Sequence, residues 1–235
     1  MNALLVRVGA DRSKGGGSWN GPVESQSGKF AYVAIPETRT VHAGTEKPYI
    51  ALVPVLSNFG VSLPARLHPR HMHLDPDFSH LSYGDQGERA KQLRKLDPGD
   101  VIAFYSGLKD VRREQRLVYA MIGLFVVDTI VLATSVSASA RDTNAHSRRI
   151  LTGTDQDLIV YARPKVSGRL ERCFPIGEWR DRAYRVRQDV LETWGGLSVK
   201  NGYLQRSARL PWFLAPERFR RWFESKEPTL LQANN

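Results

Sequence analysis

The segment that decides the fold lies mid-chain: LDPGDVIAFYS (residues 96–106), followed after a charged loop by LVYAMIGLFVVDTIVLATSVSASA (residues 117–140). The Asp-Pro-Gly-Asp run near its start is typical of a turn. Both apolar stretches are rich in β-branched and aromatic side chains, which favour strands. We therefore predict strands at 101–105 and 117–127 that are joined by the charged loop.

The second stretch is long enough to cross a membrane. However, Gly123 and Asp128 interrupt it, and near its end Ser135, Ser137 and Ser139 alternate with small residues. This composition indicates two buried strands with a turn near Asp128. We therefore expect no membrane span.

Further strands are indicated by short apolar or alternating runs at residues 3–8, 30–35, 49–55 and 158–162. Consecutive strands are joined by loops more often than by helices, which favours antiparallel pairing. The predicted fold class is α+β, with a mixed or mostly antiparallel sheet or partial barrel and about three helices.

The first predicted helix covers residues 85–96, where Asp85 and Glu88 have the spacing of a capping box. The second covers 183–194 and ends at a Gly-Gly pair, and the third begins at Pro216, a residue suited to a first helical turn.

Composition excludes several classes of protein. The chain has 235 residues and 41% apolar side chains, which excludes disorder as a description of the whole. Cys173 is the single cysteine, which excludes a disulfide scaffold and a cysteine-rich zinc finger and suits a reducing compartment. No signal-like apolar run opens the sequence, so we expect a cytoplasmic protein. We expect one domain over residues 1–224 and a frayed tail at 225–235.

Positive charge is unevenly distributed. The formal net charge is +10, with 16 basic and 13 acidic side chains in residues 1–140 and 18 and 11 in residues 141–235. Arginine supplies most of the C-terminal excess, and its fork matches phosphate geometry. This favours contact with a nucleotide or nucleic acid, and the alternative interpretation is solubility alone.

The densest polar segment is HPRHMHLDPDFSH (residues 68–80), which holds four of the six histidines. In an extended chain His71, His73 and Asp75 face one side. Such side chains bind a metal or perform acid–base chemistry, and two close carboxylates such as Asp75 and Asp77 raise the pKa of one of them. The alternative is a polar loop whose carboxylates cap turns.

A second polar segment contains Asn144, His146, Arg148 and Arg149. The first two can hydrogen-bond a base edge, and the two arginines can hold phosphate. Its alternative is a solvated loop. A third, GADRSKGGG (residues 9–17), is neither a phosphate-binding P-loop nor a dinucleotide fingerprint. Its amides could bind an anion beside Asp11, or it is a plain loop.

The central strands weakly resemble the PUA/EVE-like readers of modified bases, small β-barrels that hold a flipped base between aromatic side chains. That resemblance assigns base stacking to Phe104, Tyr105 or Trp19.

Taken in chain order, these pieces resemble the nucleotide modification associated domain 3 family, from the N-terminus to about residue 216. The pieces are Arg7, Gly9 and Asp11 with the glycines after them, Ile35-Pro36-Glu37, His73-Leu74-Asp75-Pro76-Asp77, Tyr83-Gly84-Asp85-Gln86-Gly87, Pro98-Gly99-Asp100 with Phe104-Tyr105, Asn144-Ala145-His146, Leu158–Ala162 and Arg209–Phe213. The resemblance implies a phage or bacterial system that modifies nucleic-acid bases.

We therefore expect a protein that acts on a nucleotide or a base in nucleic acid. The candidate catalytic residues are His73, Asp75, Asp77 and His146, and the candidate substrate-binding residues are Asp11, Asn144, Arg148, Arg149, Phe104 and Tyr105. We assign no metal ligand and no cofactor. The expected partner is a nucleotide or nucleic acid, with other proteins of a modification operon as further candidates. The alternatives are a non-catalytic reader of a modified base and an accessory subunit of a modification complex.

Overall fold

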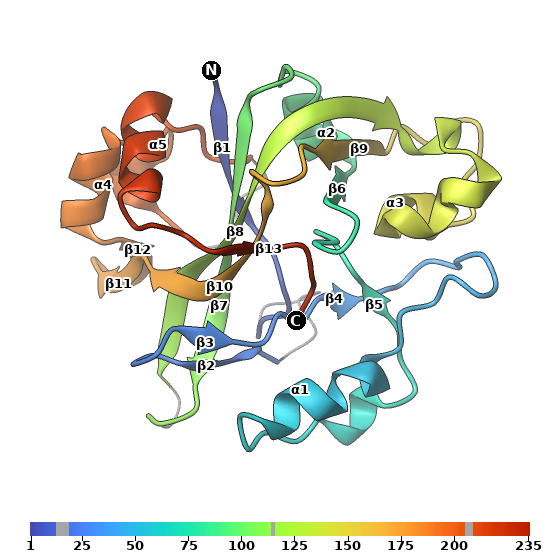
Figure 1. The fold of residues 1–235 in the computed structure, drawn as a ribbon, viewed down its shortest axis with the longest axis horizontal. Helices are drawn as coiled ribbons and strands as arrows, with labels where there is room; N and C mark the ends of the chain where they lie inside the picture. Colours follow the sequence, from blue (N-terminus) through green and yellow to red (C-terminus); the bar gives the residue numbers. More distant parts are fainter. Residues whose placement is uncertain (13–18, 114–115, 205–208) are drawn as a thin grey trace.

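A computed structural model describes residues 1–12, 19–113, 116–204 and 209–235 (Figure 1). The part of the glycine loop from residue 13 to 17 lies outside the described residues. Within them, a mixed sheet curls into half a barrel, in the order β13-β10-β8-β7-β2-β3, with β1 on β7 and the β6–β9 pair on β8. Its strands are β1 (Ala3–Arg7), β2 (Pro22–Glu24), β3 (Lys29–Phe30), β6 (Ser82–Asp85), β7 (Val101–Asp110), β8 (Leu117–Leu132), β9 (Leu158–Ala162), β10 (Gly168–Pro175) and β13 (Leu230–Leu231).

The predicted α+β class and mixed sheet are confirmed. Strands β1 and β2 run parallel to β7, whereas β8 runs antiparallel to β7, β9 and β10. Two small ribbons complete the strands, β4 (Ile35–Pro36) with β5 (Met72–His73) and β11 (Gly177–Arg180) with β12 (Ala183–Val186). Of the strand predicted at 30–35, only the two ends form strands, Phe30 in β3 and Ile35 in β4.

The turn predicted near Asp128 is wrong, because β8 is one continuous strand. Its first part pairs with β7 and β10, and its second part pairs with β9 after a register shift between Val127 and Thr129. Asp128 lies at this bulge, with an exposed side chain 3.7 Å from the guanidinium of Arg163. The polar residue thus marks a bend of the barrel, which takes β8 from one neighbour to the next.

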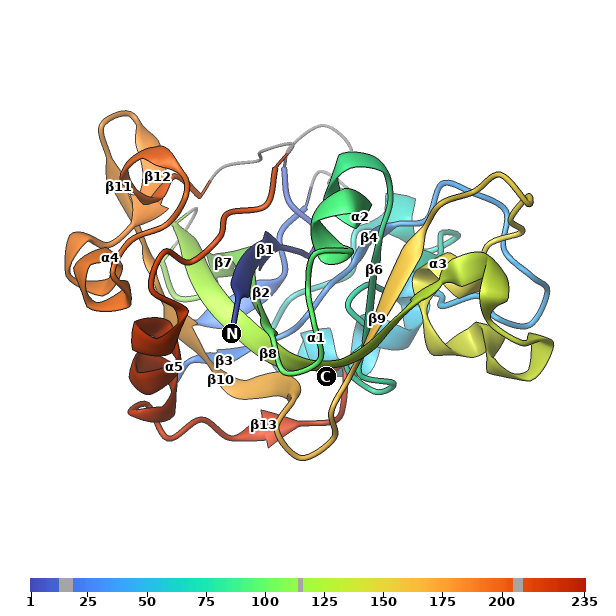
Figure 2. The same ribbon diagram turned by 90° about the horizontal axis from the view of Figure 1, so that it is seen from above.

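Both faces of the central strands are covered. Along β1 and β7, Leu4, Val6 and Phe104 enter one hydrophobic core, and the alternate residues Leu5 and Tyr105 enter the other. In both views, α4 (Gln188–Trp194), α5 (Pro216–Glu224) and the β11–β12 ribbon lie on one side, and α2 (Gly87–Leu93), β6, β9 and α3 (Ala145–Arg148) lie on the other (Figure 2). The candidate site lies on the second side.

The strand predicted at 49–55 is wrong, because this segment forms a 3-10 turn (Tyr49–Leu52) and helix α1 (Val53–Ser57). Tyr49, Leu52 and Leu56 are buried, which is the three- and four-residue spacing of one helical face. Pro54 occupies the first helical turn, a position that tolerates proline.

The helix predicted at 183–194 is correct only in its second half. Residues Ala183–Val186 form β12, and the turn before it contains Asp181 and Arg182, both with positive φ, as in the tight turns of hairpins. Helix α4 ends as predicted at Gly195, which has a left-handed φ of 78°. The described residues form five α-helices. Two of them, α1 and α3, are short single turns, and the other three are the predicted helices.

The tail is not frayed. Leu230 and Leu231 pair with β10, and the side chains of Asn234 and Asn235 accept hydrogen bonds from the backbone N–H groups of Phe78 and Tyr32. Within the described residues, no helix is both long and apolar enough to cross a membrane.

Candidate functional site

His73 is positioned by the β4–β5 ribbon. Ile35 pairs with His73 in this ribbon, so that Glu37, just beyond β4, lies beside the imidazole. The Nδ1 atom of His73 is 2.6 Å from Oε2 of Glu37, and both side chains are buried. Because an ionised carboxylate only accepts hydrogen bonds, Nδ1 carries a proton and donates it.

His146 is positioned by the start of α3. The side chain of Asn144 caps this helix by accepting a hydrogen bond from the N–H of His146 (2.8 Å). The Nδ1 atom of His146 is 2.6 Å from Oδ2 of Asp157, a buried residue just before β9. Each histidine thus has its own buried carboxylate behind it.

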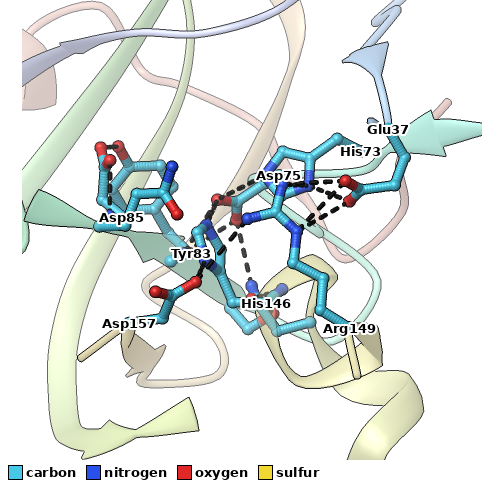
Figure 3. A network of polar contacts seen from close by, with 12 residues as sticks. Glu37, His73, Asp75, Tyr83, Asp85, His146, Arg149 and Asp157 are labelled. Atoms are coloured by element: carbon cyan, nitrogen blue, oxygen red, sulfur yellow. Dashed lines mark hydrogen bonds and ion pairs between the residues drawn. The ribbon is translucent and has the colours of Figure 1, made fainter. Parts of the chain in front are cut away.

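The two imidazoles converge on Asp75. Its Oδ2 lies 3.6 Å from Nε2 of His146 and 4.0 Å from Nε2 of His73 (Figure 3). The carboxylate is held by hydrogen bonds from the backbone N–H of Gly84 (2.9 and 3.1 Å) and from Nδ2 of Asn144 (3.1 Å). Two neighbouring residues of the histidine-rich segment and the distant His146 therefore present their polar atoms to one point.

Arg149 lies between the two carboxylates of the cluster, Glu37 and Asp157. Its guanidinium donates to Glu37 at 3.0 to 3.2 Å and lies 3.7 Å from Asp157, so that it joins the two carboxylates behind the histidines. The atom nearest Asp157 is Nη1, which is buried and makes no hydrogen bond to the described residues. The Arg149 side chain also lines the adjoining cavity, where a guanidinium suits an anionic ligand.

The two histidines differ in charge. Burial acts to lower the pKa of His146, but the interactions with Asp157 and Asp75 outweigh it and raise the pKa to about 9. At His73 burial prevails over the hydrogen bond to Glu37, and the positive charges of His146 and Arg149 act with it, so its pKa lies below the usual value. At neutral pH one ring can donate a proton and the other can accept one.

These residues form one wall of a cavity of about 390 Å³, a size suited to a small ligand. The opposite part of the lining is also polar. It contains the Arg7–Asp11 ion pair (2.7 Å), together with Asp85 and Arg89. Asp11, a predicted substrate-binding residue, therefore lies in the same cavity as His73.

The prediction that Asp85 caps helix α2 is wrong. Helix α2 begins at Gly87 after Gln86, whose side chain makes no capping bond. The carboxylate of Asp85 accepts a hydrogen bond from the hydroxyl of Tyr83 (2.6 Å) at the cavity wall, and burial raises its pKa. The spacing that indicates a capping box marks a cavity residue here.

Asp77 and Arg148 lie outside this cavity. Nη2 of Arg148 donates to Oδ2 of Asp77 at 2.5 Å, and its Nε donates to Asp142. Asp77 also accepts from Nδ2 of Asn234 in the tail. Asp77 and Arg148 are thus both buried in an ion-paired arrangement that does not line the candidate cavity.

The aromatic candidates do not face the cavity. Phe104 is fully buried and packs edge-to-face on Phe78 and Phe125. Tyr105 is buried in the other core, where its hydroxyl donates to the carbonyl of Leu204. Trp19 is partly buried against the first core. Neither Phe104 nor Tyr105 has an exposed ring face on which a base could stack.

Many C-terminal arginines have acidic or carbonyl partners within the protein. Arg180 and Arg187 pair with Glu178 and Asp189, and Arg218 donates to the carbonyls of Glu192 and Thr193. Glu37, Tyr83 and Asp157 are not assigned roles from sequence patterns, and Asp85 is assigned only that of a helix cap. For Asp157, the local signal is an acidic residue directly before a buried strand.

Comparison with known proteins supports one assignment. The model of a family described as nucleotide modification associated domain 3 matches residues 2–223. Neither the curated proteins nor the solved structures gave a match to the chain.

Proposed function

Because the chain belongs to the nucleotide modification associated domain 3 family, we propose that its cavity binds a nucleotide, or a base turned out of a nucleic acid, and is the site of a reaction on it. The observation that carries the proposal is the convergence of His73, Asp75 and His146 on one wall of a polar cavity. Buried histidines and carboxylates at one point are typical of a reactive site.

The cavity offers groups for each part of a nucleotide. The guanidinium of Arg149, which lines the cavity, suits a phosphate or carbonyl oxygen at the histidine end. At the other end, the carboxyl group of Asp85 and the amide of Gln86 suit the donors and acceptors of a base edge. The reacting atoms would lie between these ends, at Asp75.

The reader alternative depends on aromatic stacking, which the burial of Phe104 and Tyr105 does not favour. An accessory subunit would need no cavity of this kind. The enzyme interpretation therefore explains more of the buried polar residues than either alternative does.

The experiment is calorimetric titration of the full chain with each nucleoside 5′-monophosphate and with short single strands, followed by mass spectrometry of the nucleotides after incubation. We expect saturable binding of at least one nucleotide and a change in its mass, both weakened in Asp75→Asn. The matched control is Asp128→Asn, at the exposed bulge of β8. Absence of binding to every nucleotide and strand would contradict the proposal and favour the accessory subunit.

A further inference from the structure

We propose that His73, Asp75 and His146 together bind one divalent transition-metal ion. From the sequence, metal binding is one possible role of the histidine-rich segment, with no ligand assigned. In the structure, one ligand atom from each of these three residues lies within 4.8 Å of the others, and all three residues are buried. The reaction that such an ion would serve rests on the proposed function, whereas the affinity for the ion can be measured separately.

The distances suit a site that contracts slightly on binding. Ligand atoms in a tetrahedral zinc site lie ~2.0–2.2 Å from the ion and hence roughly 3.3 Å from one another. The Nε2 atoms of His146 and His73 lie 3.6 and 4.0 Å from Oδ2 of Asp75. Small rotations of the side chains would bring all three atoms into coordination range.

The carboxylates behind the two rings suit metal ligands. Glu37 and Asp157 each face an Nδ1 atom at 2.6 Å, and this fixes the proton of the neutral ring on Nδ1. The lone pair of each neutral ring is then on Nε2, the atom that faces Asp75. A carboxylate behind a histidine is the usual outer-shell arrangement of a metal ligand, and it raises the basicity of the coordinating nitrogen.

The charge of the cluster also calls for a cation. Glu37, Asp75 and Asp157 are three buried carboxylates, and the guanidinium of Arg149 offsets one of them. An ion bound at Nε2 displaces the extra proton of His146, and with both rings then neutral the cluster has a formal charge of −2. A divalent ion at Asp75 would neutralise this charge, and buried charge without compensation is strongly unfavourable.

Two histidines and one carboxylate leave coordination positions open, as in catalytic rather than structural metal sites. The cavity provides the space for water or substrate at these positions. When bound, the ion would polarise a water molecule or an oxygen of the nucleotide.

The experiment uses the full chain after dialysis against a chelator. Zinc, manganese, cobalt and anaerobic ferrous ions are titrated separately by calorimetry, and the cobalt complex is also followed by its visible spectrum. We expect one ion of at least one metal to bind per chain, with a cobalt spectrum indicating nitrogen ligands. Asp75→Asn should abolish binding, whereas Glu37→Gln and Asp157→Asn should weaken it about 10- to 100-fold.

The matched control is His71→Ala, which removes an exposed histidine of the same segment and should leave the affinity unchanged. If none of the four metals binds stoichiometrically to the wild-type chain, or if folded Asp75→Asn binds as tightly as the wild type, the proposal is overturned. Titration of nucleotides into metal-free and metal-loaded protein separates the two proposals. Metal binding without nucleotide binding would contradict the proposed function alone.

Discussion

His73 and His146 pack edge to face, with ring centroids 5.0 Å apart and planes inclined at 76°. The two residues are far apart in the sequence. Each ring is backed by its own carboxylate and directs Nε2 toward Asp75. Both histidines therefore belong to one site around Asp75, and a substitution that moves either ring should disturb that site.

Gly84 is required by the close approach of β6 to His146. A Cβ atom at this position would lie 2.4 Å from Cδ2 of His146 and 2.9 Å from Oδ1 of Asn144. We expect Gly84→Ala to cost about 1–3 kcal/mol of stability and to abolish nucleotide binding, because the ring must move. Chemical denaturation and calorimetry measure the two effects. Gly153→Ala, with no atom within 4 Å of the added carbon, is the control, and equal behaviour of both variants would refute the steric explanation.

We predict that the buried pair of Asp77 and Arg148 acts on stability rather than on chemistry. We expect Asp77→Asn to lower the free energy of unfolding by roughly 3 kcal/mol, because it leaves the guanidinium without its buried partner. Asp142→Asn removes the half-exposed partner of the same arginine and should cost less than about 1 kcal/mol. Urea denaturation of both variants checks this order, and an Asp77→Asn protein of wild-type stability would contradict it.

The same pair predicts a pH dependence. Burial acts to raise the pKa of Asp77, but the charge and hydrogen bond of Arg148 outweigh it, so the folded-state pKa lies below the usual value. Its contribution to stability is therefore complete above the unfolded pKa of about 3.9 and is lost as the pH falls through the folded pKa. We expect the stability difference between wild type and Asp77→Asn to be constant from neutrality to about pH 5 and to shrink below about pH 4. A difference that grows in acid would show the opposite sign.

Phe104 separates the enzyme from the reader interpretation. Its ring is fully buried between Phe78 and Phe125, so Phe104→Ala should cost about 3–5 kcal/mol. Phe104→Leu conserves more of the volume, and we expect it to fold and to bind nucleotides as tightly as the wild type. Titration of folded Phe104→Leu decides the point, since a large loss of affinity would indicate that the ring contacts a base.

Local patterns predicted much of the fold. The turn before Val101, the β-branched runs and the Gly-Gly helix end all lie where expected. The errors arose where a local signal has two structural outcomes. Asp128 marks a bulge instead of a turn, and the apolar residues around Tyr49 form a helical face that periodicity alone did not separate from a strand.

The candidate site was predicted in part. His73, Asp75 and His146 were identified from their residue types, and the cavity unites them. Glu37 and Asp157 were not assigned roles, because a histidine's partner is set by strand pairing and by the path of the chain after α3, which no local pattern encodes. Asp77 and Arg148 belong to the same two segments as the site, but they face each other outside the cavity.

The most direct measurement of nucleotide binding in this cavity is a crystal structure of the full chain soaked with the monophosphate that binds most tightly in titration. We expect density for the phosphate within hydrogen-bond distance of the guanidinium of Arg149 and for the rest of the nucleotide between Asp75 and Asp85. A nucleotide bound elsewhere on the protein, with none in the cavity, would contradict the proposed function.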